Sequence, residues 1–139
     1  EVIKCRYLSP RQDNGYEAIT DSLPQNTMME PLGGIGSVDS QKVVCLRKLI
    51  AYTRRNDIKL VFVISPRFYR VEDEVYHIGK EVAAENGILL IDMLNLPELM
   101  RPEYFADETH MNDAGARKFT AILSEHLRET IKEEYLWTY

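Results

Sequence analysis

"KLVFVIS", residues 59–65, is the stretch that decides the fold class of this chain. Its five successive apolar residues, three of them β-branched, are bounded by Lys59 on one side and by Ser65 and Pro66 on the other. An unbroken apolar run of this length is typical of a strand that is buried on both faces, as in a parallel sheet. We therefore predict such a strand over residues 59–65.

The same signature recurs in "ILLIDM", residues 88–93, and helical patterns lie before, between and after the two runs. Helices are predicted from Ser40, which can cap the first one, to about residue 55, over about 72–85, and from about Asn112 onward. Asn86 and Gly87 are typical of a left-handed helix stop. An alternation of helices with buried strands gives a parallel sheet covered by helices, so we predict an α/β fold.

The first 39 residues carry a different pattern. "EVIKCRYL", residues 1–8, alternates apolar and charged side chains, which favours a half-exposed strand. Proline and glycine then recur without a sustained period up to about residue 39, which indicates irregular structure. With 139 residues in all, we predict a single domain over 1–139, with an irregular segment at 1–39 and an α/β core at 40–134.

Composition and charge exclude several classes of function. Because 22 acidic residues outnumber 17 basic ones and we interpret the basic residues as dispersed, we expect no nucleic-acid partner. No apolar run reaches the length that crosses a bilayer. Cys5 and Cys45 form no CxxC pair and both lie in apolar patterns, so we expect buried free thiols. We expect no metal site and no cofactor.

The polar loop in "FADETHMNDAGARKF", residues 105–119, combines residue types that carry acid–base chemistry. Asp107 lies three positions before His110, so its carboxylate can reach back to the imidazole, hold one tautomer and stabilise the imidazolium that forms on proton uptake. The other ring nitrogen is then free to act as a base. Asn112 can cap the following helix, and Gly115 permits the close approach of another segment.

Sheet topology predicts where this loop lies. Ligands of parallel α/β sheets bind at the carboxyl ends of the strands, where Ser65 ends the first predicted strand. Arg67 and Tyr69 follow at the same edge and are candidates for contacting an anionic or sugar substrate, together with Ser65. We expect Asp107 and His110 to reach this edge too.

The block "FADETHMNDAGARKF" resembles the last conserved block of SGNH (GDSL-type) hydrolases, an Asp-x-x-His that precedes the C-terminal helix. Asp107 and His110 match the acid and the base of the Ser-His-Asp triad of that family. "MNDAGARKFTAIL" resembles the tail of a subgroup that includes cell-envelope acyl-transfer proteins, and "KLVFVISP" and "GILLIDM" resemble the last two strands of the family's sheet. The resemblance implies a three-layer, flavodoxin-like parallel sheet with flanking helices, of which this chain is the C-terminal part.

The function that the resemblance implies is that of an esterase or acyltransferase. Its substrate would be a small-molecule or glycan O-acyl ester, such as one on a carbohydrate or a cell-envelope polymer, and its place would be outside the cytoplasm. The family's serine block and its oxyanion-hole Gly and Asn have no convincing counterpart, because Ser37 and Ser40 follow no buried strand and Ser65 precedes Pro66. We therefore expect the nucleophile upstream of Glu1, and no activity from these 139 residues alone. A sheet surface left uncovered predicts a homodimer.

Three other interpretations of the loop stay open. A non-catalytic, hydrolase-like binding or assembly module would share the fold but lack the nucleophile. A metal site could use Asp107, His110 and Asp113, with Glu103 or Glu108, although one histidine among carboxylates is a poor set for zinc. A purely structural loop would cap the last helix, with His110 bonded to Asp107 for stability.

Overall fold

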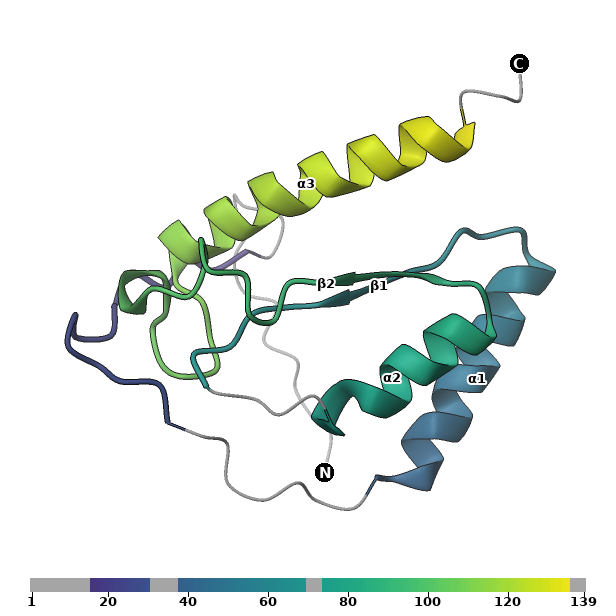
Figure 1. The fold of residues 1–139 in the computed structure, drawn as a ribbon, viewed down its shortest axis with the longest axis horizontal. Helices are drawn as coiled ribbons and strands as arrows, with labels where there is room; N and C mark the ends of the chain where they lie inside the picture. The colour runs from purple at the N-terminus through teal and green to yellow at the C-terminus, as the bar shows by residue number, and fades with distance from the viewer. Residues whose placement is uncertain (1–15, 31–37, 70–73, 136–139) are drawn as a thin grey trace, which may run out of the picture.

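The computed structural model describes residues 16–30, 38–69 and 74–135. Over this part of the chain the predicted alternation of helices and strands is confirmed (Figure 1). The elements are α1 (Ser40–Arg55), β1 (Val61–Ile64), α2 (Glu74–Glu85), β2 (Leu89–Asp92), the 3₁₀ helix η1 (Pro102–Tyr104) and α3 (Asp113–Tyr135). The predicted strand at 1–8, which includes Cys5, lies outside the described residues, as does Ser37.

The two strands pair in parallel, as the sequence predicted. Their register runs from Val61 opposite Leu89 to Ile64 opposite Asp92. The Met93 N–H donates to the Ile64 carbonyl at 3.0 Å, which carries the pairing one residue further. Both strands therefore end at the same edge of the sheet.

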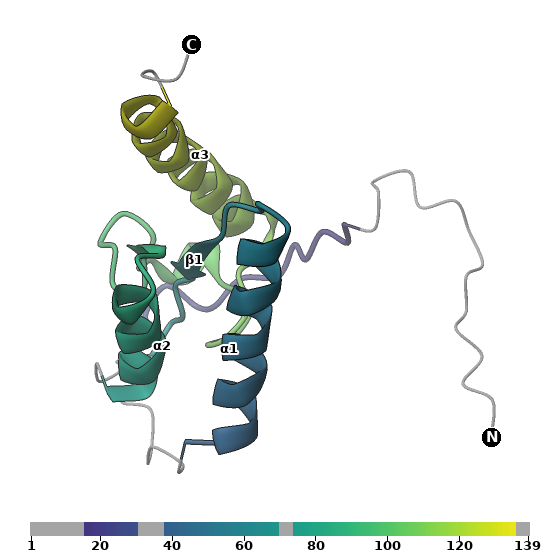
Figure 2. The same cartoon turned by 90° about the vertical axis from the view of Figure 1, so that its right-hand side faces the viewer.

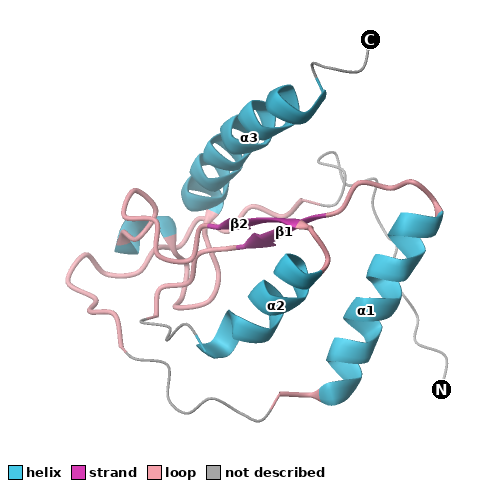
Figure 3. Cartoon of the chain, turned by 45° about the vertical axis from the view of Figure 1, so that its right-hand side comes forward, coloured by secondary structure: helices cyan, strands magenta, loops and turns pink. Residues whose placement is uncertain are grey.

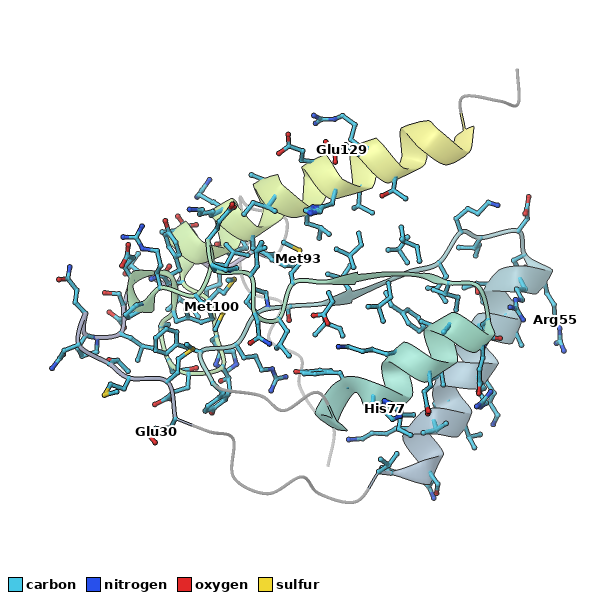
Figure 4. All side chains as sticks on the ribbon, in the orientation of Figure 1. Glu30, Arg55, His77, Met93, Met100 and Glu129 are labelled. Carbon is cyan, nitrogen blue, oxygen red and sulfur yellow. The ribbon has the colours of Figure 1, made fainter. Side chains whose placement is uncertain are left out.

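Helices lie on both sides of this strand pair. α3 runs along one side, and α1 and α2 lie next to each other on the other (Figures 1 and 2). Met93, which is buried, lies between α3 and the strands (Figure 4). The described residues thus form a mixed α/β fold with three α-helices and a two-stranded parallel sheet. The buried apolar residues are Ile50, Ile64, Phe68, Val82, Ala83, Met93, Leu94, Leu99 and Phe105.

Local chemistry explains where the helices begin and end. The prediction that Ser40 caps α1 is wrong, because Asp39 is the capping residue and accepts a hydrogen bond from the Gln41 N–H at 2.9 Å. The left-handed stop after α2 is confirmed by Gly87, whose φ is 60°. Asp57, just beyond α1, has a φ of 53°, so the two helices end in similar ways.

Two predictions of burial are wrong. Cys45 is exposed, because it lies five residues from buried Ile50, about 140° around the helix. β1 is not buried on both faces, since Val63 is 38% exposed. The faces of a strand are covered by segments that pack above and below the sheet, and the described residues leave the Val63 face of β1 partly open.

Candidate functional site

The loop that contains Asp107 and His110 is a closed turn. Phe105 and Met111 form an antiparallel bridge at its base, and the Ala106 N–H donates to the His110 carbonyl at 2.8 Å. This loop, η1 and the loops that follow both strands gather around the carboxyl ends of β1 and β2 (Figure 3). The loop therefore lies at the edge where parallel α/β sheets bind their ligands.

Asp107 and His110 form the hydrogen-bonded pair that their spacing predicted. The His110 Nδ1 lies 2.9 Å from Oδ2 and 3.0 Å from Oδ1 of Asp107. Both side chains are accessible, at 68% exposure for His110 and 51% for Asp107. The His110 Nε2 makes no hydrogen bond with any described residue, so this nitrogen is available as a proton acceptor.

Asp107 also anchors the backbone of its own loop. Its Oδ1 accepts hydrogen bonds from the Thr109 N–H, the Thr109 hydroxyl and the His110 N–H, each at 2.8 Å. The hydrogen bond with the His110 side chain, followed by those from Thr109, lowers the pKa of Asp107 well below its usual range. The carboxylate therefore stays ionised at every pH at which an imidazole titrates.

Thr109 is a member of the site that sequence reasoning missed. Besides its bond to Asp107, its Oγ1 lies 2.9 Å from the His110 Nδ1, so this hydroxyl supports the Nδ1 side of the ring. The bond from the Thr109 N–H to Asp107 is an Asx turn, which an Asp in a loop favours, but the two contacts of the Thr109 hydroxyl have no such signal in the sequence.

Aromatic packing attaches the loop to the segment that follows β1. The rings of Phe68 and Phe105, both buried, lie 5.3 Å apart between centroids. The Phe68 N–H donates to the Glu108 carbonyl at 2.9 Å. The expectation that this segment and the Asp–His loop meet at one edge is therefore confirmed at the level of the backbone.

The three predicted substrate-binding residues lie on that attached segment but differ in their surroundings. Ser65 and Arg67 are exposed, whereas Tyr69 is half-buried and packs against Ile64 and Leu94. No hydrogen bond or ion pair joins the side chains of Ser65, Arg67 or Tyr69 to Asp107 or His110. The structure thus brings the segment to the loop without linking these side chains to the pair.

A segment far away in sequence holds the base of the loop. The Leu23 N–H donates to the Phe105 carbonyl, and the Asp113 N–H donates to the Ile19 carbonyl, both at 2.8 Å. Residues 19–23 therefore bond to both ends of the Asp–His loop. Sequence reasoning placed this segment in irregular structure and gave it no role.

Asn112 and Gly115 fix the start of α3, as predicted. The buried Asn112 caps the helix through Oδ1, which accepts from the Gly115 N–H at 3.0 Å. Its Nδ2 donates to the Glu103 carbonyl at 2.8 Å and to the Asp21 carbonyl at 3.1 Å. A Cβ on Gly115 would overlap the Tyr104 carbonyl, which confirms the predicted close approach.

Two nearby acidic residues, Asp113 and Asp92, are engaged in other contacts. Asp113 accepts hydrogen bonds from the Arg117 Nε and from the Tyr16 hydroxyl, both at 2.8 Å. Asp92, at the end of β2, lies 2.8 Å from the Lys80 ammonium group. Within 16–30, 38–69 and 74–135, no group of three or more His, Cys, Asp or Glu side chains is placed to hold a metal ion.

No protein-family model, curated protein or solved structure matches this chain. The relation to SGNH hydrolases therefore stays a prediction that rests on the residues quoted above. What the described residues provide for chemistry is the His110 imidazole, held in one orientation by the ionised carboxylate of Asp107 at Nδ1.

Proposed function

We propose that this chain supplies the acid and the base of a serine-type, SGNH-like esterase or acyltransferase that acts on an O-acyl ester. The observation that carries the proposal is the Asp107–His110 pair, in which the carboxylate engages Nδ1 and leaves Nε2 open. Its position at the carboxyl ends of β1 and β2 supports a catalytic role over a purely structural one.

The reaction follows from this arrangement. The His110 Nε2 takes the proton of a serine hydroxyl as the serine oxygen attacks the ester carbonyl, and Asp107 stabilises the imidazolium that forms. His110 then gives the proton to the departing alcohol, which leaves an acyl-serine. Water or an acceptor hydroxyl, activated by the same nitrogen, releases the acyl group and regenerates the serine.

The nucleophile in this proposal comes from outside the described residues. In a flavodoxin-like sheet it would follow a strand that continues the sheet next to β1, which pairs only with β2 among the described residues. The exposed Arg67 lies one residue before Phe68, which is bonded to the Asp–His loop, and suits an anionic group or a sugar on the substrate. An ester on a carbohydrate or cell-envelope polymer is the substrate class that we propose.

Fluorophosphonate labelling tests the proposed base. In the protein expressed from its complete coding sequence, we expect one serine to be labelled and the label to be located by mass spectrometry. His110→Ala should slow labelling about 10²-fold or more, because the serine loses its proton acceptor. His126→Ala, which removes an exposed histidine on α3, is the matched control and should label at the normal rate.

Labelling that is unchanged in His110→Ala would contradict the proposed base. A protein that takes no label would favour the second candidate, a non-catalytic binding or assembly module. That candidate is supported by one observation, which is that no hydroxyl of a described residue hydrogen-bonds to the His110 Nε2.

A further inference from the structure

Charge is distributed unevenly along this chain, and α1 is its basic part. The helix carries five cations and no acidic residue: Lys42, Arg47, Lys48, Arg54 and Arg55. This leaves 12 basic against 22 acidic residues elsewhere, a net charge of −10 outside α1. The expectation that the basic residues are dispersed is therefore wrong for this element.

α1 also exposes apolar side chains on the side that faces away from the core. Ile50 and Thr53 are buried, whereas Val44, Leu49 and Tyr52 are 50%, 46% and 60% exposed. A helix with apolar residues on both sides has a second surface that is suited to burial. We call Val44, Lys48, Leu49, Tyr52 and Arg55 the outer face of α1.

Two of the five cations attach α1 to the end of α2. Arg47 forms an ion pair with Glu85 at 3.1 Å, and the Arg54 guanidinium donates to the Asn86 carbonyl at 2.7 Å. By contrast, Lys48 and Arg55 on the outer face make no ion pair with a described residue. Arg55 projects outward from the end of the helix (Figure 4). The outer face thus presents positive charge next to exposed apolar surface.

We propose that the outer face of α1 binds the surface of a bilayer that contains anionic lipid. Interfacial helices combine apolar and tyrosine side chains with lysine and arginine, and they carry few acidic residues on that surface. The described part of the chain contains no helix that is long and apolar enough to span a membrane, so the contact would lie in the interface. This inference does not depend on the catalytic proposal.

The geometry favours a lipid surface over other anionic partners. Ile50 and Thr53 hold one side of α1 against the rest of the chain, and a flat surface can reach the opposite, outer face. A symmetric pairing of two outer faces would bring Lys48 and Arg55 of one copy close to the same cations of the other. Nucleic acid would match the charge, but it gives no reason to expose Val44, Leu49 and Tyr52.

Vesicle sedimentation with the full chain tests the proposal. We expect binding to vesicles of phosphatidylcholine with about a third phosphatidylglycerol, no binding to phosphatidylcholine alone, and weakening as salt is raised from low to high ionic strength. Lys48→Glu should weaken binding about fivefold or more, because it removes one cation from the surface and adds an anion. Arg128→Glu makes the same charge change at an exposed position on α3 and should bind as the parent does.

A second measurement reports contact at the helix itself. Cys45, which is exposed on α1, can carry a polarity-sensitive fluorophore in a Cys5→Ser background. Its emission should shift to shorter wavelength when anionic vesicles are added, and Tyr52→Ser should reduce the shift. Circular dichroism of each variant checks that the fold is retained.

Several results would overturn the proposal. The first is that the chain does not bind anionic vesicles, and the second is that Lys48→Glu and Arg128→Glu weaken vesicle binding equally. The third is that the emission of the fluorophore on Cys45 does not shift while the chain binds. Retention of the chain on a polynucleotide, without binding to vesicles, would identify α1 as a nucleic-acid contact instead.

Discussion

Asp107 accepts hydrogen bonds from three groups besides the imidazole of His110, so its carboxylate holds the loop as well as the ring. These bonds form to the ionised carboxylate, and they explain why its pKa is lowered even though half of the side chain is exposed. A single residue therefore links loop stability to the orientation of the proposed base.

This link predicts a pH-dependent effect of Asp107→Asn on stability. Because the pKa of Asp107 is lower in the folded state than in the unfolded chain, its contribution is complete above about pH 5 and is lost as pH falls through about 4 and below. We expect Asp107→Asn to lower the free energy of unfolding by about 1 kcal/mol at pH 7, given its exposure, and by less at pH 3.

Urea unfolding of both proteins at pH 7, 5 and 3 measures this difference. Asp21→Asn is the control, because the Asp21 side chain makes no hydrogen bond with a described residue, and it should leave the free energy of unfolding nearly unchanged. A constant difference for Asp107→Asn at all three values would count against the assigned role.

At the residue scale, the sequence predicts the contacts that are local. Asp107 and His110 are three residues apart, and Asn112 caps a helix that begins at the next position, so short-range geometry is sufficient. The contact of Phe68 with Phe105 joins residues 37 positions apart, and nothing in the spacing of either residue indicates its partner.

The start of α3 offers a paired test at the element scale. Gly115→Ala should destabilise the protein by about 1–3 kcal/mol, because the added Cβ meets the Tyr104 backbone, which cannot move aside as a side chain can. Gly79→Ala, in α2, adds a Cβ with nothing within 4 Å and should stabilise by about 0.5–1 kcal/mol.

Thermal unfolding of the two glycine variants shows whether the steric effect of the added Cβ or the reduced backbone freedom of the unfolded chain dominates at each position. If both variants gain stability, the approach of Gly115 to Tyr104 is looser than the structure shows. If only Gly115→Ala unfolds early, the close approach of α3 to the Tyr104 backbone in η1 is confirmed in solution.

Elements were predictable where apolar periodicity is strong. The strand at 59–65 corresponds to Val61–Ile64, which is shorter because pairing ends before the apolar run does. The helix at 72–85 corresponds, over the described residues, to Glu74–Glu85. The burial of β1 was overestimated. An apolar run shows that a strand is suited to burial on both faces, but it does not show which segments pack on those faces.

At the scale of the whole molecule, exposed apolar surface predicts self-association. Val63 on β1 and Ile58 before it are 38% and 48% exposed, close to a strand that pairs with only β2 in the described sheet. We expect a homodimer by size exclusion with light scattering, and a shift toward monomer in Val63→Lys, because a charge would be buried in the contact.

Val44→Ser is the matched control for this dimer, because it changes exposed apolar surface on α1 and not on the sheet. It should leave the dimer intact. If the parent protein is a monomer at every concentration measured, the predicted dimer contact through the sheet is wrong.

The bonds from residues 19–23 to the Asp–His loop have a consequence for how the chain reaches its final structure. They close loops of more than 80 residues, because Leu23 bonds to Phe105 and Ile19 bonds to Asp113. Contacts of such long sequence separation are costly in chain entropy and form late. During synthesis, residues 19–23 leave the ribosome long before the loop exists, so they remain without these partners until residues 105–113 have been made as well.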